Sequence, residues 1–371
     1  MAIDIDNAVC ESCFTDIYLV NFIQQNGEEI EKCSVCGSDN DLGPLYAIDA
    51  GKLTDLFDPL IWMYSTVENF MPLPMLKGDG YEHWDNMIWN KLVDDWDIFD
   101  NYDVAQKIIN MMYHVYSHDG ETYDFLHSAV EIEADWYDHE EDVMNVSMYE
   151  WKYFCDEIRN ENRFFPKKLN LDKLKYLLQA NELILKKGFI TYRGRKAACI
   201  TPFVADKLLK PPSHKANVGR MNPKGISYFY CADSIKTVIH ELRPLKNENV
   251  TVGIFSTTQN LKIVDLSNPF LESPFQYGKK LKSIYVLRKF MRELIEEISK
   301  LPDPNDPYLD YLPAQYVCEY IKVCGYDGIK YKSSQCDGRN FALFDDKHLR
   351  IGPIQFIQSP EMNYKFESKV V

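Results

Sequence analysis

The chain has 371 residues, of which 46% are hydrophobic and 13% aromatic, and it carries a net charge of −15. This length predicts two or three domains, and the apolar content excludes an intrinsically disordered chain. No basic and apolar leader opens the sequence and no run reaches the roughly 18 apolar residues of a membrane span, so we expect a soluble, cytoplasmic protein that makes no membrane contact.

Two Cys-x2-Cys pairs stand near the start of the chain. Cys10 and Cys13 form the first pair, and Cys33 and Cys36 form the second. Each pair can form a turn that presents two thiolates to one ion, so the spacing predicts a four-cysteine zinc ribbon over residues 1–44. Four thiolates leave no open position for water, which makes the predicted Zn²⁺ structural. The alternative is a set of four unrelated buried thiols.

Residues 45–160 are acidic and are predicted to be α-helical. Apolar side chains recur at helical spacing over 86–117 and again over 144–158. Five histidines, at positions 83, 114, 118, 127 and 139, admit a metal site, because two of them lie one helical turn apart. The alternative is that they are ordinary surface or interface histidines.

A change of charge separates this acidic region from the rest of the chain. Residues 1–158 hold 34 acidic and 6 basic side chains, a net charge of −28, whereas residues 159–371 hold 22 acidic and 35 basic ones, a net charge of +13. The acidic half should repel nucleic acid, and the basic half could host an anionic ligand. A plain solvated face is the other interpretation of the acidic half.

The basic half is predicted to form a mixed α/β domain over residues 161–371. Apolar periodicity predicts a helix over 171–187, closed by Gly188. Further on, the patterns predict strands over 189–193, 226–231, 250–255, 261–266, 328–333 and 340–344, and helices over 234–242, 284–300 and 315–324.

Side chains suited to chemistry gather in four stretches of this half: 191–195, 219–223, 228–241 and 331–334. They offer arginines for a pyrophosphate, tyrosines that can stack on rings, serine hydroxyls, and one glutamate that could stabilise positive charge on a ribose. Taken singly, each of these residues is also typical of an ordinary protein surface.

Taken in order, these stretches resemble the RES domain family. GRMNPKGISYFYCADSIKTVIHELRP (219–244) resembles the family's central block and TYRGR (191–195) its opening strand; LPAQYVCEYIKVCGYDGIKYKSSQ (312–335) and GRNFALFD (338–345) resemble its closing block. The resemblance covers about residues 188–350. It implies a fold akin to ADP-ribosyltransferases and NAD⁺ as substrate. Members of the family hydrolyse or phosphorolyse NAD⁺ or transfer ADP-ribose to a protein, and many are toxins neutralised by an antitoxin.

The resemblance also implies roles for individual residues. The family's arginine, glutamate and serine fall on Arg193, Glu241 and Ser333, which are the expected catalytic residues, with the adjoining Ser334 as the alternative serine. The residues expected to contact NAD⁺ are Tyr192, Arg193, Arg220, Tyr230, Ser333 and Ser334. The two arginines would clamp the pyrophosphate while Glu241 stabilises the ribose as nicotinamide leaves.

The N-terminal part resembles domains that are fused to RES modules and grouped with the HEPN superfamily. Catalytic HEPN ribonucleases carry an Arg-x4-6-His motif. Here no arginine precedes Arg159 and no such motif follows it. The resemblance therefore implies a regulatory or partner-binding domain over residues 45–160.

The sequence thus predicts an NAD⁺-cleaving RES toxin or effector with phosphate or water as acceptor. An antitoxin or another regulatory protein is the expected partner, and a homo-oligomer is compatible with the sequence. Toxin–antitoxin systems, phage defence and nucleotide turnover all remain open as biological settings. Two alternatives are an ADP-ribosyltransferase that modifies a protein and a non-catalytic protein that binds NAD⁺ or another nucleotide.

Overall fold

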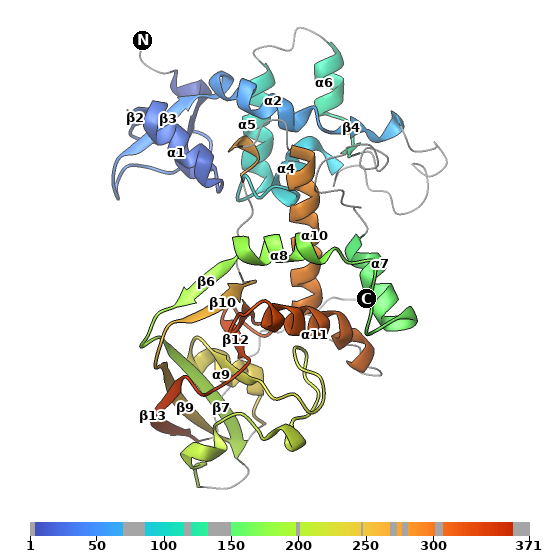
Figure 1. The fold of residues 1–371 in the computed structure, drawn as a ribbon. Coiled ribbons are helices and arrows are strands. Elements are labelled where there is room, and N and C mark those ends of the chain that lie inside the picture. The colour runs from blue at the N-terminus through green and yellow to red at the C-terminus, as the bar shows by residue number, and fades with distance from the viewer. Residues whose placement is uncertain are drawn as a thin grey trace, which may run out of the picture. The chain divides into compact units, whose positions relative to one another are not determined.

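The computed structural model describes residues 4–69, 86–114, 120–132, 150–197, 201–245, 248–267, 273–276, 281–300 and 307–358. Contacts divide the chain into two units: Met1–Met148 with Leu271–Lys289, and Tyr149–Phe270 with Phe290–Val371 (Figure 1). The segment Leu271–Lys289 thus belongs to the first unit, although it lies inside the predicted C-terminal domain. Apolar packing explains this assignment, because the side chains of Leu281, Ile284 and Tyr285 lie in the hydrophobic core of the first unit.

The first unit begins with a small antiparallel sheet. Its strands lie in the order β1 (Ala8–Cys10), β3 (Leu45–Asp49) and β2 (Glu28–Ile30), and helix α1 (Ile17–Asn26) connects β1 to β2. Asp16 caps this helix by accepting the N–H groups of Tyr18 and Leu19. The predicted helical region therefore starts too early at residue 45, because β3 pairs with a strand on each side.

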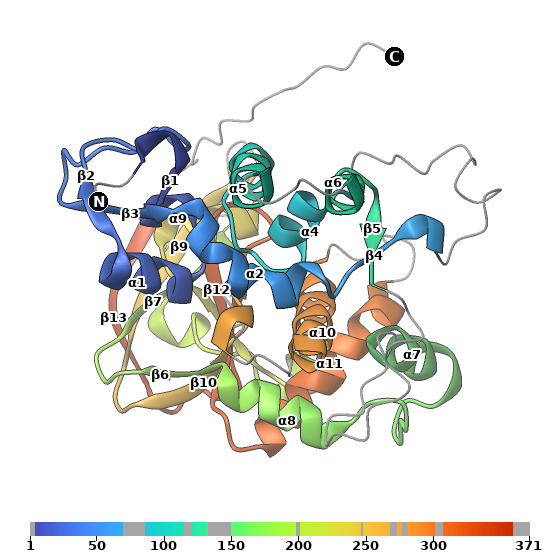
Figure 2. The same cartoon turned by 90° about the horizontal axis from the view of Figure 1, so that it is seen from above.

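The rest of the first unit is mainly helical. It contains α2 (Thr54–Ile61), α4 (Ile88–Asp94), α5 (Tyr102–His114) and α6 (Gly120–Leu126), with the short pair β4 (Ser65–Thr66) and β5 (Val130–Glu131) (Figure 2). The helical prediction for 86–117 is confirmed up to residue 114, with a break around Asp97, which has a positive φ of 52°. The buried Trp96 and Phe57 lie in its core.

Of the five histidines predicted as candidate metal ligands, only His127 has a described side chain. Positions 83, 118 and 139 lie outside the described residues, as does the side chain of His114. The His127 ring stacks on Tyr123 at 4.1 Å, and its Nδ1 lies 2.9 Å from the Tyr123 carbonyl oxygen. His127 is therefore engaged by its own helix turn.

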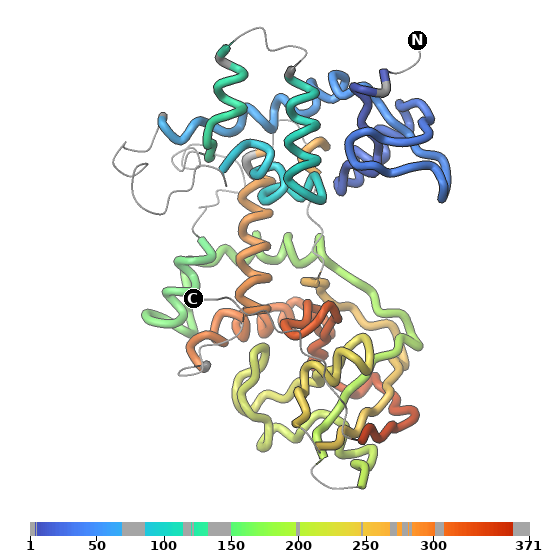
Figure 3. The backbone as a smooth tube through the Cα atoms, turned by 180° about the vertical axis from the view of Figure 1, so that it is seen from behind, coloured from blue at the N-terminus to red at the C-terminus, as the bar shows by residue number. Residues whose placement is uncertain are grey.

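The second unit is built on an eight-stranded mixed sheet (Figure 1), and Figure 3 traces its backbone from behind. The strands follow the order β13 (Leu349–Ile357), β9 (Asn249–Thr257), β7 (Ile190–Ala197), β8 (Phe229–Ala232), β12 (Arg339–Leu343), β11 (Gly328–Lys332), β10 (Leu261–Asp265) and β6 (Glu182–Leu185). Strands β10 and β11 pair in parallel, and the other neighbours pair antiparallel. The six predicted strands are confirmed with small shifts of their ends, whereas β6 and β13 were missed.

The helices of the second unit are α7 (Glu150–Asp156) with a π-helical turn (Glu157–Glu161), α8 (Leu171–Ala180), α9 (Ile235–Leu242) and α11 (Pro307–Val323). Helix α10 (Leu281–Ser299) belongs to this unit from Phe290 onward. None of the helices in the described parts of the chain is long and apolar enough to cross a membrane.

The helix predicted over 171–187 is wrong beyond residue 180. Helix α8 ends at Ala180, and residues 182–185 form β6 instead. Leu183 and Leu185 alternate with more exposed residues and pack against the sheet core, while the strand pairs with β10. Gly188 follows with a positive φ of 89°, which suits the turn into β7. Tertiary pairing has overridden the helical periodicity here.

Candidate functional site

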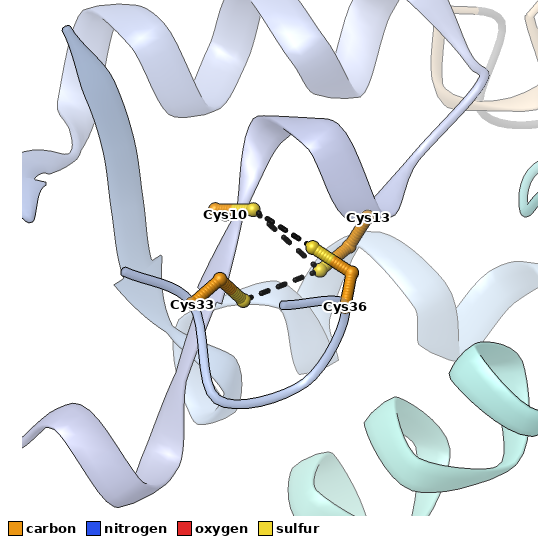
Figure 4. Close-up of side chains that lie close together, drawn as sticks. All are labelled: Cys10, Cys13, Cys33 and Cys36. Atoms are coloured by element: carbon orange, nitrogen blue, oxygen red, sulfur yellow. Dashed lines mark hydrogen bonds between the residues drawn. The ribbon is translucent and has the colours of Figure 1, made fainter. Parts of the chain in front are cut away.

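The four predicted metal ligands lie together in the first unit. The Sγ atom of Cys10 lies 3.7 Å from that of Cys13 and 3.5 Å from that of Cys36, and the Sγ atoms of Cys13 and Cys33 are 3.7 Å apart (Figure 4). All four lie within 4.8 Å of one another. Thiolates on a tetrahedral zinc are about 3.8 Å apart, given bonds of about 2.3 Å. The donor set therefore fits a tetrahedral metal–thiolate site.

The sheet of the second unit has two faces that carry different residues. Cross-strand partners share a face, and the register places Tyr192 opposite Ala232, Ala232 opposite Asn340, and Asn340 opposite Tyr331. Gly194 of β7 lies on this face too, because a Cβ there would come within 2.4 Å of Val238 on α9. We call this side the α9 face.

Glu241 lies on α9 at this face, with its carboxylate held from the neighbouring strands. Its Oε1 accepts a hydrogen bond of 2.6 Å from the Ser333 hydroxyl and one of 2.6 Å from the Asn340 side-chain amide. Ser333 follows β11, and its Oγ accepts the Gln335 backbone N–H at 3.0 Å. The structure thus brings together the predicted glutamate and serine, and it adds Asn340 to them.

Tyr230 and Tyr331 extend the α9 face beside this carboxylate. Tyr230 lies two residues before Ala232 and donates its hydroxyl to Asn222 Oδ1 at 2.6 Å. Burial raises the pKa of the Tyr331 hydroxyl; the Glu241 carboxylate adds to the rise and the Arg220 guanidinium opposes it. Tyr331 is therefore within electrostatic reach of both an acidic and a basic member of the predicted site.

Arg220 is anchored to the end of α10. Its Nη1 donates to the carbonyl oxygens of Ile298 at 3.0 Å and Ser299 at 3.2 Å. Such bonds satisfy carbonyls that have no partner within their own helix and complement the negative end of its dipole. The Arg220 guanidinium thus has a structural partner while remaining near Tyr230 and Tyr331.

Arg193 projects from the other face of the sheet. Its guanidinium lies 4.9 Å from the ring of Phe229, and its Nη1 donates to the Tyr230 carbonyl oxygen at 2.5 Å. Strands β7 and β8 pair only at Tyr192 and Ala232, so Arg193 bridges the two strands next to that point. Burial lowers the pKa of Arg193 to about 10, which leaves it charged at neutral pH. The structure does not bring Arg193 onto the face that carries Glu241 and Ser333.

One family model matches the C-terminal part of the chain. The RES domain model covers residues 196–366. The chain carries a RES domain. The matched range includes Arg220, Tyr230, Glu241, Ser333 and Ser334, and it begins after Tyr192 and Arg193.

A search of solved structures found a toxin–antitoxin complex that aligns with about half of the chain. The crystal structure of the M. tuberculosis MbcT–MbcA complex aligns with a TM-score of 0.29 and 14% identity, over 51% of this chain and 95% of that chain. No curated protein matches the chain. The family assignment therefore rests on the domain match.

Within the RES domain, the two adjacent serines are in different positions. Ser333 bonds Glu241, whereas Ser334 is exposed and its Oγ accepts the Gln335 side-chain amide at 3.0 Å. Of the two serines, Ser333 is therefore the one in hydrogen-bond contact with Glu241.

Two groups of site residues were missed from the sequence. One is Asn340 on β12, a polar residue that directly precedes three apolar ones (RNFAL) and that the structure shows to be buried. The other is a polar support under the GRMNP loop. There the buried Asn222 donates to three backbone carbonyls, and Gln315 donates to the carbonyls of Gly219 and Asn222.

Helix α9 packs closely against the backbone at Gly338 through its Thr237 side chain. Asp233 accepts the Thr237 hydroxyl and the Arg339 backbone N–H, which joins the start of α9 to β12. A Cβ at Gly338 would lie only 2.0 Å from Thr237 Oγ1. Glycine at position 338 is thus needed for α9 to dock and to bring Glu241 to Ser333.

We therefore expect Gly338→Ala to destabilise the RES domain by about 1–3 kcal/mol, the usual cost of overpacking. The measurement is the free energy of unfolding from urea titration. Gly352→Ala is the matched control, because a Cβ there would meet only the Ile254 carbonyl oxygen at 3.4 Å, an ordinary contact. Equal free energies for the two variants would contradict the docking role of Gly338.

A hollow of about 750 Å³ lies elsewhere in the second unit. It is lined by Trp151, Lys152, Cys155, Asp156, Arg159, Glu293, Glu296, Glu297, Ser299 and Lys300. Arg159 forms an ion pair there with Glu297, and no predicted site residue lines it. Size alone does not make this hollow the functional site, since the residues suited to chemistry lie on the α9 face.

Proposed function

We propose that the RES domain cleaves NAD⁺ between nicotinamide and ribose, within a fold akin to that of ADP-ribosyltransferases. The observation that carries this proposal is the Glu241 carboxylate, which Ser333 and Asn340 hold on the face that also bears Tyr230 and Tyr331. Membership of the RES family supports NAD⁺ as the substrate class.

The proposed reaction needs one well-placed carboxylate rather than an acid–base pair. Nicotinamide is already a cationic leaving group in NAD⁺, so its departure requires no general acid. As the bond from the ribose C1″ to the nicotinamide nitrogen breaks, its electron pair goes to nicotinamide and positive charge develops on the ribose. Glu241 stabilises that charge. Water as acceptor then gives ADP-ribose and a proton, and phosphate gives ADP-ribose 1″-phosphate.

The other predicted residues take roles that follow from their surroundings. Arg220 supplies positive charge for the pyrophosphate, and the ring of Tyr230 faces the same side as Glu241. Ser333 orients the carboxylate through its 2.6 Å hydrogen bond. Arg193 does not contact the substrate in this proposal. Its hydrogen bond to the Tyr230 carbonyl oxygen stabilises the strand that carries Tyr230.

We further propose that Cys10, Cys13, Cys33 and Cys36 hold a structural Zn²⁺. Their mutual distances support this, and a four-thiolate site leaves no position for a substrate. The zinc would tie the turn at Cys33–Cys36 to the start of the chain. The acidic first half, with its net charge of −28, is then a surface for a regulatory protein such as an antitoxin.

The test of the enzymatic proposal is incubation of the full chain with NAD⁺, with and without inorganic phosphate, followed by NMR of nicotinamide and the adenosine product. We expect nicotinamide release. Dependence on phosphate identifies a phosphorylase, and independence identifies a glycohydrolase. A covalent label on protein from labelled NAD⁺ would identify an ADP-ribosyltransferase. Bound but intact NAD⁺ after long incubation would contradict cleavage and favour a nucleotide sensor.

A further inference from the structure

The Glu241 carboxylate is held asymmetrically. Both donors, the Ser333 hydroxyl and the Asn340 amide, bond the same oxygen, Oε1, at 2.6 Å. Among the described residues, none donates a hydrogen bond to Oε2. Because Glu241 itself is exposed, this second oxygen is accessible to a ligand on the α9 face.

Asn340 differs from Ser333 in being buried. It is 6% exposed, on a strand whose next three residues are all buried apolar side chains. A buried amide that lacks a hydrogen bond is costly, so its presence calls for a partner. The register places Asn340 between Ala232 and Tyr331, and from there its Nδ2 reaches Glu241.

The chemistry of the amide suits it to holding a carboxylate in one orientation. The terminal torsion of a glutamate is broad and roughly two-fold, so one donor alone leaves the carboxylate free to turn over. Two donors on one oxygen, one from β12 and one from the end of β11, define its plane. An amide NH₂ only donates and does not titrate, so it bonds the ionised carboxylate at every working pH.

We propose that Asn340 is a positioning residue for the cleavage reaction. Together with Ser333 it occupies Oε1 of Glu241 and so directs Oε2 to the ribose, where the positive charge develops. This inference rests on the proposed function, because it assigns the orientation of the group that stabilises the ribose.

Asn340→Asp tests the proposal most sharply, because it keeps the side-chain volume and replaces the donor with a second carboxylate. Two carboxylates at hydrogen-bond distance share a proton, which raises the apparent pKa of one of them. We expect the acid limb of the pH profile of kcat/KM to move up by about one unit or more. At neutral pH we expect kcat to fall about ten- to a hundredfold, with a smaller change in KM.

Asn340→Ser, which restores a neutral donor, should recover part of kcat and return the pH profile to that of the wild type. The matched control is Asn181→Asp, since Asn181 is similarly buried at 4% exposure and donates to the Leu177 carbonyl oxygen. A merely structural role for Asn340 predicts equal losses of stability in the two aspartate variants and an unmoved pH profile. That result would overturn the proposal.

A second measurement separates this inference from the proposed function. The Glu241 carboxyl can be observed at neutral pH by NMR of ¹³C-labelled glutamate carboxyls, with Glu241→Gln identifying the signal. We expect its chemical shift to change in Asn340→Asp and to stay at the wild-type value in Asn181→Asp. Failure of the wild type to release nicotinamide would reject NAD⁺ cleavage, whereas an unchanged Glu241 signal in Asn340→Asp would reject the positioning role.

Discussion

Glu241→Gln is expected to lower NAD⁺ cleavage by roughly two to three orders of magnitude, the usual effect of removing one electrostatic stabiliser of a transition state. Glutamine keeps the size of the side chain and can still accept a hydrogen bond from Ser333 or Asn340. It removes the negative charge that opposes the cation on the ribose. The loss should therefore fall on kcat, and NAD⁺ binding should change little. The measurement is the rate of nicotinamide release over a range of NAD⁺ concentrations.

Glu182→Gln is the matched control for this result. Glu182 lies on β6, the edge strand that β11 and β10 separate from β12, and it pairs with Lys262 at the surface. Its replacement should leave kcat and KM unchanged. If Glu241→Gln cleaved NAD⁺ at the wild-type rate, the proposed role of the Glu241 carboxylate would be rejected. The non-catalytic alternative, a nucleotide sensor, would then be favoured.

Cys33→Ser is expected to abolish stoichiometric zinc binding and to unfold the small sheet of the first unit. A structural zinc contributes its binding free energy directly to folding, on the order of 10 kcal/mol or more in small domains. Here the turn at Cys33–Cys36 follows β2, and the cluster also includes Cys10 at the end of β1. The measurements are the metal content by mass spectrometry and the thermal unfolding curve, with a chelator added to the wild type as a parallel treatment.

Cys324→Ser provides the comparison for the metal experiment. Cys324 is half-buried in the second unit and lies outside the four-cysteine cluster, so this variant should keep one zinc per chain. Full zinc content in Cys33→Ser would mean that the cluster is not the metal site. In that case the four cysteines would be better described as buried thiols.

Much of this molecule could be predicted because the information is local. The spacing of the cysteine pairs was sufficient to predict that they come together, since a two-residue gap forms a turn that aims both thiols the same way. Six strands of the RES domain were visible as short apolar runs between turn residues. The family resemblance also identified Glu241 and Ser333 as residues of one site, and their side chains form a hydrogen bond.

Other features depended on pairings that no local pattern encodes. Residues 182–185 form a strand because β10 offers them an edge, although their periodicity suits a helix. Leu45–Asp49 likewise becomes the centre of a sheet through its partners on both sides. In both places tertiary hydrogen bonding outweighs intrinsic preference.

The composition of the site itself was decided by the register of the sheet. Successive residues of a strand point to opposite faces, so pairing with β8 and β9 determines that Tyr192 and Arg193 lie on opposite sides. Asn340 meets Glu241 across 99 positions of sequence, which only the docking of α9 beside β12 brings about. The sequence by itself determined which side chains were available for the chemistry. The strand register and the helix docking determined which of them meet, because both arise from long-range contacts.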